Sequence, residues 1–422
     1  MKEYLISEDK NHPSTGIKNF LEETLKKGAQ KLLQLAIENE VQEYLEMFEL
    51  VKDERGRRVV VRNGYLPSRE IQTGIGPIEV MQPRVRSTNK EYRFTSAILP
   101  PYLRRTPSVE AVVSTLYLKG ISTGSFPEAL EAILGENAKG LSATNIVRLK
   151  QSWENEYKSW SRRDLTGKHY VYIWVDGIYC NVRLDKDRPC LLVVLGALAD
   201  GTKELVSIYD GERESKISWM EVLNNLKRQG LSIAPSLAIG DGALGFWTAL
   251  EEVFPETKMQ RCWVHKTSNI LDKMAKSVQK HAKTMIHEMY MAPTKEKGVR
   301  AFNEFIKFYE AKYPKACECL KKDKEVLFSF YEFPAEHWQH IRTTNPIEST
   351  FATIRHRTRQ TKGCGSRLAT LTMVFKLAAA AQKRWRKLRG YQLIEKIIKG
   401  VKFKDGVEIE STDQKKDQEK VA

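Results

Sequence analysis

The sequence predicts an α/β protein in which a mixed sheet, covered by helices, follows helical and small β modules. Three short segments rich in apolar and β-branched residues, 170–175, 190–199 and 204–209, succeed one another without an intervening helical pattern. Downstream of them, helical and strand patterns alternate. Consecutive strands are typical of antiparallel pairing and alternation with helices is typical of parallel pairing, so the two patterns together indicate a mixed sheet.

The alternating part of this region is assigned from hydrophobic periodicity. It predicts a helix at 218–229, a strand at 236–239, a helix at 243–253 and a strand at 258–264.

The rest of the C-terminal half is helical. Residues 267–341 carry few strand signals, and residues 342–400 are helical and strongly basic. We therefore expect a core built from 166–266 and 342–400, with 267–341 as an all-helical insertion. Residues 401–422 are polar with few large apolar side chains, which predicts a disordered tail.

Two modules are expected at the N-terminus. Apolar residues recur at helical spacing over 14–51, which indicates a helical segment within residues 1–50. Residues 51–106 read as a basic β module, with one hairpin at Asn63-Gly64 and a second between 71–73 and 78–81. A small basic sheet can contact a DNA backbone or form a solvated face; the residues concerned are Arg58, Arg62, Arg84 and Arg86.

Residues 107–165 read as three helices with short connections. The first spans 108–119, the second starts at Ser125 and the third starts at Ser142, whose hydroxyl suits an N-cap. The third would present Asn145, Arg148 and Lys150 in its first turns. This arrangement resembles a helix-turn-helix DNA-binding domain, and an ordinary helical bundle is the alternative.

The composition favours a polyanionic partner. The 422-residue chain has a formal net charge of +16, and the charge is concentrated. Residues 51–110 contain 12 Lys and Arg against 6 Asp and Glu, and residues 342–400 contain 14 against 2. Such blocks are typical of surfaces that contact phosphates. No apolar run approaches a membrane span and no signal sequence is evident, so we expect a cytoplasmic, nucleoid-associated protein with reduced cysteines.

Three carboxylates stand out. Asp176-Gly177 and Asp241-Gly242 each follow an apolar strand segment, and Glu348 lies far downstream. If the two strands are neighbours, the aspartates are adjacent, and adjacent carboxylates are costly unless a cation neutralises them. Mg²⁺ or Mn²⁺ suits such oxygen ligands. The alternatives are a turn for each Asp-Gly pair and a helix cap for Glu348, which its local pattern favours.

The order of these residues resembles the bacterial branch of the Mutator-like transposases. The resemblance covers about residues 63–389 and is specific at Asp176-Gly177, Gly240-Asp241-Gly242, Cys262-Trp263-Val264-His265, the 342–348 motif and the arginine-rich run 355–359. It implies an RNase H-like fold with a helical insertion. It also implies that Asp176, Asp241 and Glu348 bind metal, with two ions expected, and that His265 orients a carboxylate or contacts the scissile phosphate.

The function that the resemblance implies is DNA transposition. The protein would bind the terminal inverted repeats of its own mobile element, cleave the ends and join them to target DNA, as a homodimer or larger assembly. The alternatives are a nuclease or resolvase of the same fold and a non-catalytic DNA-binding regulator. Zinc binding by Cys262 and His265 is disfavoured because no second ligand pair is near. Near the active site, DNA contacts are expected from Arg342, Asn345, Arg355, Arg357 and Arg359.

Overall fold

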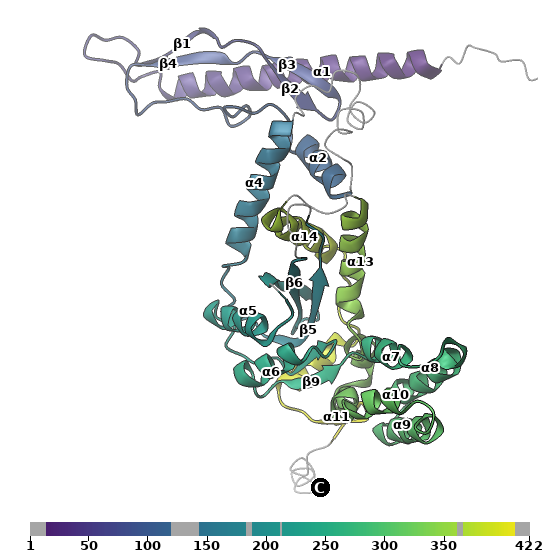
Figure 1. Cartoon of the computed structure of the whole chain (residues 1–422). Coiled ribbons are helices and arrows are strands. Elements are labelled where there is room, and N and C mark those ends of the chain that lie inside the picture. The colour runs from purple at the N-terminus through teal and green to yellow at the C-terminus, as the bar shows by residue number, and fades with distance from the viewer. Residues whose placement is uncertain (1–13, 120–142, 183–187, 212, 361–365, 410–422) are drawn as a thin grey trace, which may run out of the picture. The chain divides into compact units, whose positions relative to one another are not determined.

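The computed structural model describes residues 14–119, 143–182, 188–211, 213–360 and 366–409. The chain forms two compact units, Met1–Leu149 and Lys150–Ala422 (Figure 1). In the described part of the chain, no helix combines the length and apolar character needed to cross a bilayer.

The first unit contains one long helix and four short strands. The helix α1 occupies Ser14–Met47, which confirms the predicted N-terminal helix. The strands are β1 (Val60–Tyr65), β2 (Arg69–Thr73), β3 (Gly76–Val80) and β4 (Pro83–Ser87). Ile37 of α1 is fully buried in a cluster with Ile71, Ile78, Val80 and Leu99. This cluster gives the small β module a core of its own.

One of the two predicted hairpins is present. β2 and β3 pair antiparallel with Thr73 opposite Gly76, as expected. The hairpin predicted at Asn63-Gly64 is wrong, because β1 continues through these residues and pairs with β4. The register shifts between Arg62 and Tyr65, and Gly64 has a φ of 68°. The glycine therefore serves an irregularity inside a strand rather than a turn.

Two of the three helices predicted in 107–165 are described. They are α2 (Pro107–Lys119) and α4 (Ala143–Trp160). The middle helix, predicted to start at Ser125, lies outside the described residues. The helix-turn-helix domain therefore stays a prediction.

The second unit is built on a five-stranded mixed sheet in the order β7-β6-β5-β8-β9. Its strands are β5 (Tyr170–Tyr179), β6 (Cys190–Leu198), β7 (Lys203–Gly211), β8 (Leu237–Gly240) and β9 (Lys258–Arg261). β6 is antiparallel to β5 and to β7, whereas β5, β8 and β9 run parallel. The predicted mixed α/β sheet is therefore confirmed.

The two faces of β5 pack against different helices. Ile173 and Val175 belong to the core that includes Trp219 of α5 (Lys216–Arg228) and Phe246 of α6 (Leu244–Val253). Figure 1 shows α5 and α6 together beside the sheet. On the other face, the Tyr172 hydroxyl meets His337 Nδ1 at 2.7 Å, and Trp174 Nε1 donates to the His340 carbonyl at 2.9 Å.

The predicted insertion is helical wherever it is described. Its elements are α7 (Trp263–Leu271), α8 (Lys276–Met291), α9 (Lys295–Tyr309), α10 (Pro314–Lys321), α11 (Lys324–Leu327), the 3₁₀ turns η2 (Ser329–Glu332) and η3 (Ala335–His337), and α12 (Trp338–Ile341). β9 ends at Arg261, so the strand predicted over 258–264 was too long. The two ends of the insertion meet where the backbone N–H of Trp263 donates to the Arg342 carbonyl at 3.0 Å.

The chain then returns to the sheet. It does so through α13 (Asn345–Gln360) and α14 (Arg367–Gln382), followed by η4 (Tyr391–Leu393) and α15 (Ile394–Ile398). Beyond them, β10 (Phe403–Lys404) pairs with β11 (Val407–Glu408), and Phe403 is buried. The prediction of disorder is therefore wrong for residues 401–409, where one aromatic side chain anchors a short hairpin.

We expect Tyr172→Phe to lower the free energy of unfolding by roughly 1–3 kcal/mol, since it leaves a buried acceptor unpaired. Tyr172 is fully buried, and the other ring nitrogen of His337 meets the Gly390 carbonyl at 2.8 Å. Urea unfolding measures the change. Tyr179→Phe on the same strand, at an exposed position, is the control and should have little effect. Equal effects of the two changes would contradict this role of Tyr172.

Candidate active site

Asp176 lies inside a strand, not in a turn. β5 runs through Asp176 and Gly177, which pair with Val193 and Leu192 of β6. The turn interpretation of this Asp-Gly pair is therefore wrong. Alternation along the strand puts Asp176 on the same face as Tyr172 and Trp174, away from the core under α5 and α6. Asp176 is 7% exposed.

Asp241 directly follows β8, the strand next to β5. β5 and β8 pair in parallel with Trp174 opposite Ile239, and the same register continued by two residues sets Asp176 opposite Asp241. Asp241 follows the end of β8, and its Oδ1 accepts the backbone N–H of Ala243 at 2.9 Å. This second Asp-Gly pair is therefore a turn that also carries a carboxylate beside Asp176.

Glu348 lies in the first turn of α13, and its side chain does not serve as a cap. Its Oε1 is 3.3 Å from His265 Nε2 and its Oε2 accepts from Arg355 Nη2 at 2.8 Å. The backbone N–H of Asn345, which a capping glutamate would receive, instead donates to the Thr343 hydroxyl at 3.4 Å. The capping interpretation of Glu348, which the local pattern favoured, is therefore wrong.

His265 begins α7 rather than ending a strand. It lies in the first turn of that helix, and its Nδ1 is 3.4 Å from the Thr344 hydroxyl. The Thr344 N–H donates to the buried Cys262 sulfur at 3.3 Å. The Cys262–His265 motif therefore connects the end of β9 to the segment that carries Glu348.

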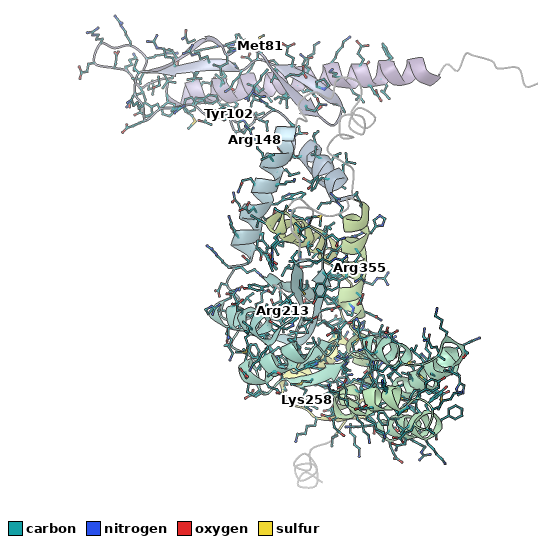
Figure 2. All side chains as sticks on the ribbon, in the orientation of Figure 1. Met81, Tyr102, Arg148, Arg213, Lys258 and Arg355 are labelled. Carbon is teal, nitrogen blue, oxygen red and sulfur yellow. The ribbon has the colours of Figure 1, made fainter. Side chains whose placement is uncertain are left out.

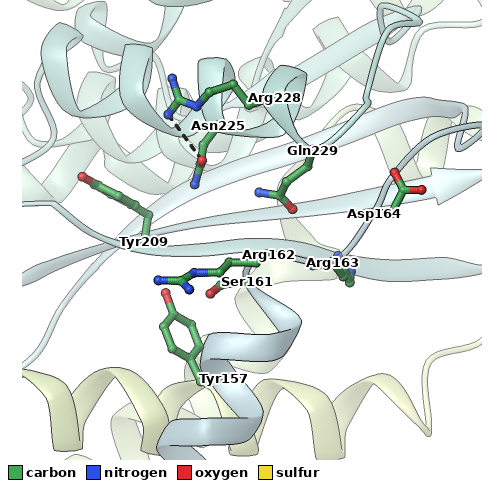
Figure 3. A pocket seen from close by; sticks show the side chains of 9 residues that line it. All are labelled: Tyr157, Ser161, Arg162, Arg163, Asp164, Tyr209, Asn225, Arg228 and Gln229. Carbon is green, nitrogen blue, oxygen red and sulfur yellow. Dashed lines mark hydrogen bonds between the residues drawn. The ribbon is translucent and has the colours of Figure 1, made fainter.

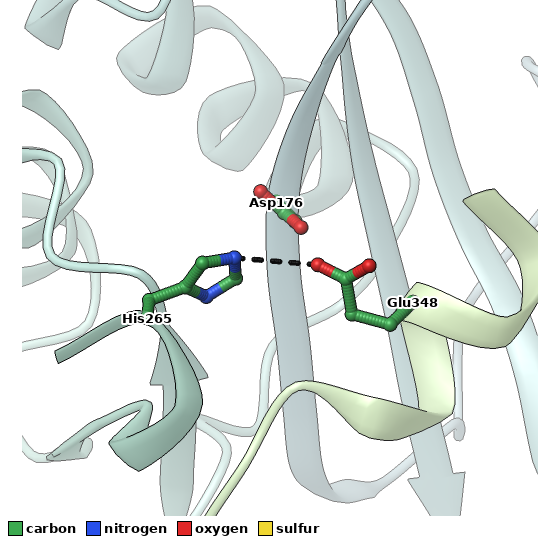
Figure 4. A group of neighbouring side chains, drawn as sticks. All are labelled: Asp176, His265 and Glu348. Atoms are coloured by element: carbon green, nitrogen blue, oxygen red, sulfur yellow. Dashed lines mark ion pairs between the residues drawn. The ribbon is translucent and has the colours of Figure 1, made fainter. Parts of the chain in front are cut away.

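Three of the predicted residues form a compact group (Figure 4). One ligand atom from each of Asp176, His265 and Glu348 lies within 4.8 Å of the others. β5, α7 and α13 each contribute one member, so the group exists only in the folded chain. Asp241 is not part of this group; its Oδ1 accepts the backbone N–H of Ala243.

Charge in this group is unevenly distributed. Burial raises the pKa of Asp176 to about 8, opposed by His265 and reinforced by Asp241 and Glu348. Hydrogen bonds from His265 and Arg355 lower the pKa of Glu348 to about 2 despite its partial burial. Interactions with Cys262 and Glu348 raise the pKa of His265. At neutral pH the ion pair of His265 and Glu348 therefore lies beside an Asp176 carboxyl that is mostly protonated.

The sequence prediction missed two neighbours of this group. Glu214, between β7 and α5, lies against Gly177, and burial followed by the nearby charge of Asp241 raises its pKa to about 7. Arg261, the last residue of β9, is buried against Gly242. Neither sits in a recognisable motif. Their proximity depends on strand order, which one sequence does not reveal.

The predicted DNA contacts in the first unit fall into two classes. Arg84 and Arg86 are exposed on β4, and Arg148 is exposed on α4 (Figure 2). Arg58 and Arg62 are also exposed, but they pair with Glu49 and Glu38. The side chain of Asn145 lies outside the described set. Lys150, at the start of the second unit, is partly buried.

The predicted DNA contacts near the active site differ more. Arg355 and Asn345 reach the surface of α13, and Arg355 is marked in Figure 2. Arg357 is 3% exposed, so the surface position expected for it is wrong. Arg342 is committed to the chain itself, since it donates to the carbonyls of Tyr290 and Trp338. The side chain of Arg359 is not among those described.

A basic cavity of about 520 Å³ lies elsewhere in the second unit (Figure 3). It is lined by Tyr157, Ser161, Arg162, Arg163, Asp164, Tyr209, Asn225, Arg228 and Gln229. Residues 157–164 precede β5, and Arg228 and Gln229 precede β8. The Tyr157 hydroxyl donates to the Ile208 carbonyl, and Arg163 donates to the Leu205 and Val206 carbonyls. The cavity therefore lies along β7, which β6 separates from β5 and Asp176.

Asp176→Asn should stabilise the metal-free protein at pH 7. Burial raises the folded-state pKa of this carboxyl to about 8, so the native protein loses stability as pH rises from about 4 toward 8. Removing the ionisable group should recover at most about 4 kcal/mol and flatten that dependence.

Thermal unfolding in chelator between pH 5 and 8 measures this. Asp200→Asn is the control of opposite sign, since hydrogen bonds from Thr202 lower the pKa of that carboxyl to about 2. The control should lower stability. A wild-type pH dependence retained in Asp176→Asn would contradict the assignment.

Comparison with known proteins agrees with the family suggested by the motifs. The protein family described as "Transposase, Mutator family" matches residues 3–388 of this chain. The transposase for insertion sequence element IS6120 of Mycolicibacterium smegmatis is 52% identical over 295 residues, covering 70% of this chain and 91% of the relative. The transposase for IST2 of Acidithiobacillus ferrooxidans is 49% identical over 287 residues, covering 66% and 95%. The chain therefore belongs to the Mutator family of transposases.

Proposed function

We propose that this chain is a DNA transposase that binds the terminal inverted repeats of its mobile element and performs metal-dependent strand cleavage and strand transfer. The observation that carries the proposal is the convergence of Asp176, His265 and Glu348, with Asp241 directly after the adjacent strand β8 and close enough for its charge to raise the pKa of Asp176. The five-stranded mixed sheet under these residues supports an RNase H-like core. The transposases at about half identity support the reaction class.

The residues present fit a divalent cation. Oxygen ligands suit Mg²⁺ or Mn²⁺, and burial together with the charges of Asp241 and Glu348 raises the pKa of the Asp176 carboxyl, which a nearby cation would lower. Asp176, Asp241 and Glu348 would hold the metal, with two ions proposed. When bound, the metal would supply positive charge that activates the attacking oxygen and stabilises the leaving oxygen at phosphorus.

The protein side chains supply orientation. His265 and Arg355 each hold one oxygen of Glu348, so the carboxylate is fixed before DNA arrives. Thr344 contacts both His265 and Cys262, which ties the start of α13 to α7. This preorganisation is what in-line displacement at a phosphodiester requires of a protein, since correct positioning supplies much of the rate.

DNA binding is proposed to use the exposed arginines of both units. Arg84, Arg86 and Arg148 are exposed in the first unit, and Arg355 and Asn345 are exposed in the second. Synapsis of two element ends would require a homodimer or larger assembly. Affinity for DNA should fall steeply with salt, because phosphate contacts release counterions.

Asp176→Ala and Asp241→Ala should each abolish cleavage and joining while binding to element ends persists. The carboxylates serve the chemical step, whereas affinity comes from the basic surfaces. The measurement is nicking of a supercoiled plasmid carrying the element end, with joined product scored separately. Cleavage without joining by the wild type would favour a nuclease, and binding without metal-dependent cleavage would favour a regulator. Normal strand transfer by either variant would contradict the proposed roles of Asp176, Asp241 and Glu348 as metal ligands.

Glu348→Gln separates chemistry from stability. We expect catalysis to collapse, since Mg²⁺ binds a neutral amide oxygen less well than a carboxylate. We also expect the metal-free protein to lose about 1–2 kcal/mol, because two charge-assisted partners of Glu348 are weakened. Plasmid nicking and urea unfolding measure the two effects. A variant that cuts and joins at wild-type rates would show that Glu348 is not a ligand.

A further inference from the structure

A buried arginine lies behind the Asp241 turn without adequate compensation. Arg261 is 5% exposed at the end of β9. Among the described residues its carboxylate partner is Asp323, with Nε and Oδ2 3.3 Å apart. Asp323 also pairs with the Nζ of Lys266 at 2.5 Å, and Lys266 is 2% exposed. Two buried cations, Arg261 and Lys266, therefore share one ion-pair partner, Asp323.

The guanidinium of Arg261 points at the turn formed by Asp241 and Gly242. Its Nη1 lies 1.0 Å from the position that a Cβ would take on Gly242. Gly242 also has a φ of 88°, which side-chain-bearing residues rarely adopt. Arg261 therefore occupies the space that the missing side chain of Gly242 leaves, and Gly242 is the residue after Asp241. This contact gives a physical reason for the glycine of the second Asp-Gly pair.

The polar atoms of Arg261 are incompletely used. In the described structure, Nε and Nη1 are buried and make no hydrogen bond. Burying a guanidinium is costly unless opposite charge and hydrogen bonds compensate for the lost water. The Nη1 end of Arg261 lies against Gly242, in the turn after Asp241.

We infer that Arg261 is a positioning residue that fixes the Asp241-Gly242 turn and connects it to the helical insertion. The inference rests on the proposed function, because Asp241 matters here as a ligand. Asp323 lies between α10 and α11, so its ion pair with Arg261 links the insertion to the placement of a catalytic carboxylate. The insertion thereby acquires a role in the geometry of the active site.

The first experiment tests the contact without metal. Gly242→Ala is made in the wild type and in Arg261→Gln, and urea unfolding of all four proteins gives a double-mutant cycle. The added methyl group should lower the folding equilibrium constant at least tenfold less in the Arg261→Gln background, because the guanidinium no longer blocks it. Equal losses in the two backgrounds would overturn the inference. If Arg261→Gln does not fold, Arg261→Lys takes its place.

The second experiment tests positioning. The Mg²⁺ concentration that gives half-maximal plasmid nicking is compared for wild type, Arg261→Gln, Arg261→Lys and Asp323→Asn. We expect at least a tenfold increase for Arg261→Gln and smaller increases for the other two variants. Lys258→Gln is the matched control. Lys258 is on the same strand as Arg261, and the change removes its exposed ion pair with Glu332 of η2. It should leave the midpoint unchanged.

The outcomes are distinguishable. A coupled cycle with an unchanged Mg²⁺ midpoint in Arg261→Gln would reduce the contact to packing and overturn the positioning role. A wild-type protein that does not nick DNA with any divalent metal would instead contradict the proposed function, whereas the stability cycle would still test the contact at Gly242.

Discussion

Burial of the Asp176 carboxyl is the constraint on which the rest of the site depends. A carboxyl group in the middle of a strand, close to two further acids, cannot ionise cheaply without a cation. In the described structure, His265 partly meets that requirement, and its ion pair with Glu348 brings α7 and α13 together over β5. Burial and the neighbouring acids oppose ionisation of the Asp176 carboxyl in the folded protein. The proposed metal site and the folded core would therefore depend on the same few charges.

Much of the second unit could be predicted from sequence, because strongly apolar strands and amphipathic helices each leave a clear period. The errors arose where a local signal was outweighed by a distant partner. Asp176-Gly177 has the composition of a turn, but nine residues of β6 pair across β5 and hold it extended. Glu348 has the position of a cap, but His265, brought near by the insertion, takes the carboxylate instead. Neither partner can be located from residues nearby in the chain.

The basic blocks show the same limit for electrostatics. A charge count treats Arg58, Arg62, Arg342 and Arg357 as equivalent to Arg84 or Arg86. In the folded protein, the first two pair with glutamates, Arg342 holds backbone carbonyls, and Arg357 is buried. Exposure and pairing depend on tertiary structure, so only part of the predicted DNA-contacting charge is available for that purpose. Arg261 shows the opposite: no sequence signal marks it, yet in the folded protein it lies against Gly242, in the turn after Asp241.

The hydrogen bond from the backbone N–H of Trp263 to the Arg342 carbonyl brings the two ends of the insertion together. Everything between them leaves and re-enters the core at almost the same place, as inserted domains commonly do. Helices α8 and α9 could therefore be exchanged during evolution more readily than η3 and α12, whose His337 and His340 contact β5. A segment with such freedom is a natural place for lineages to acquire new partners, provided that a carboxylate equivalent to Asp323 continues to face the core.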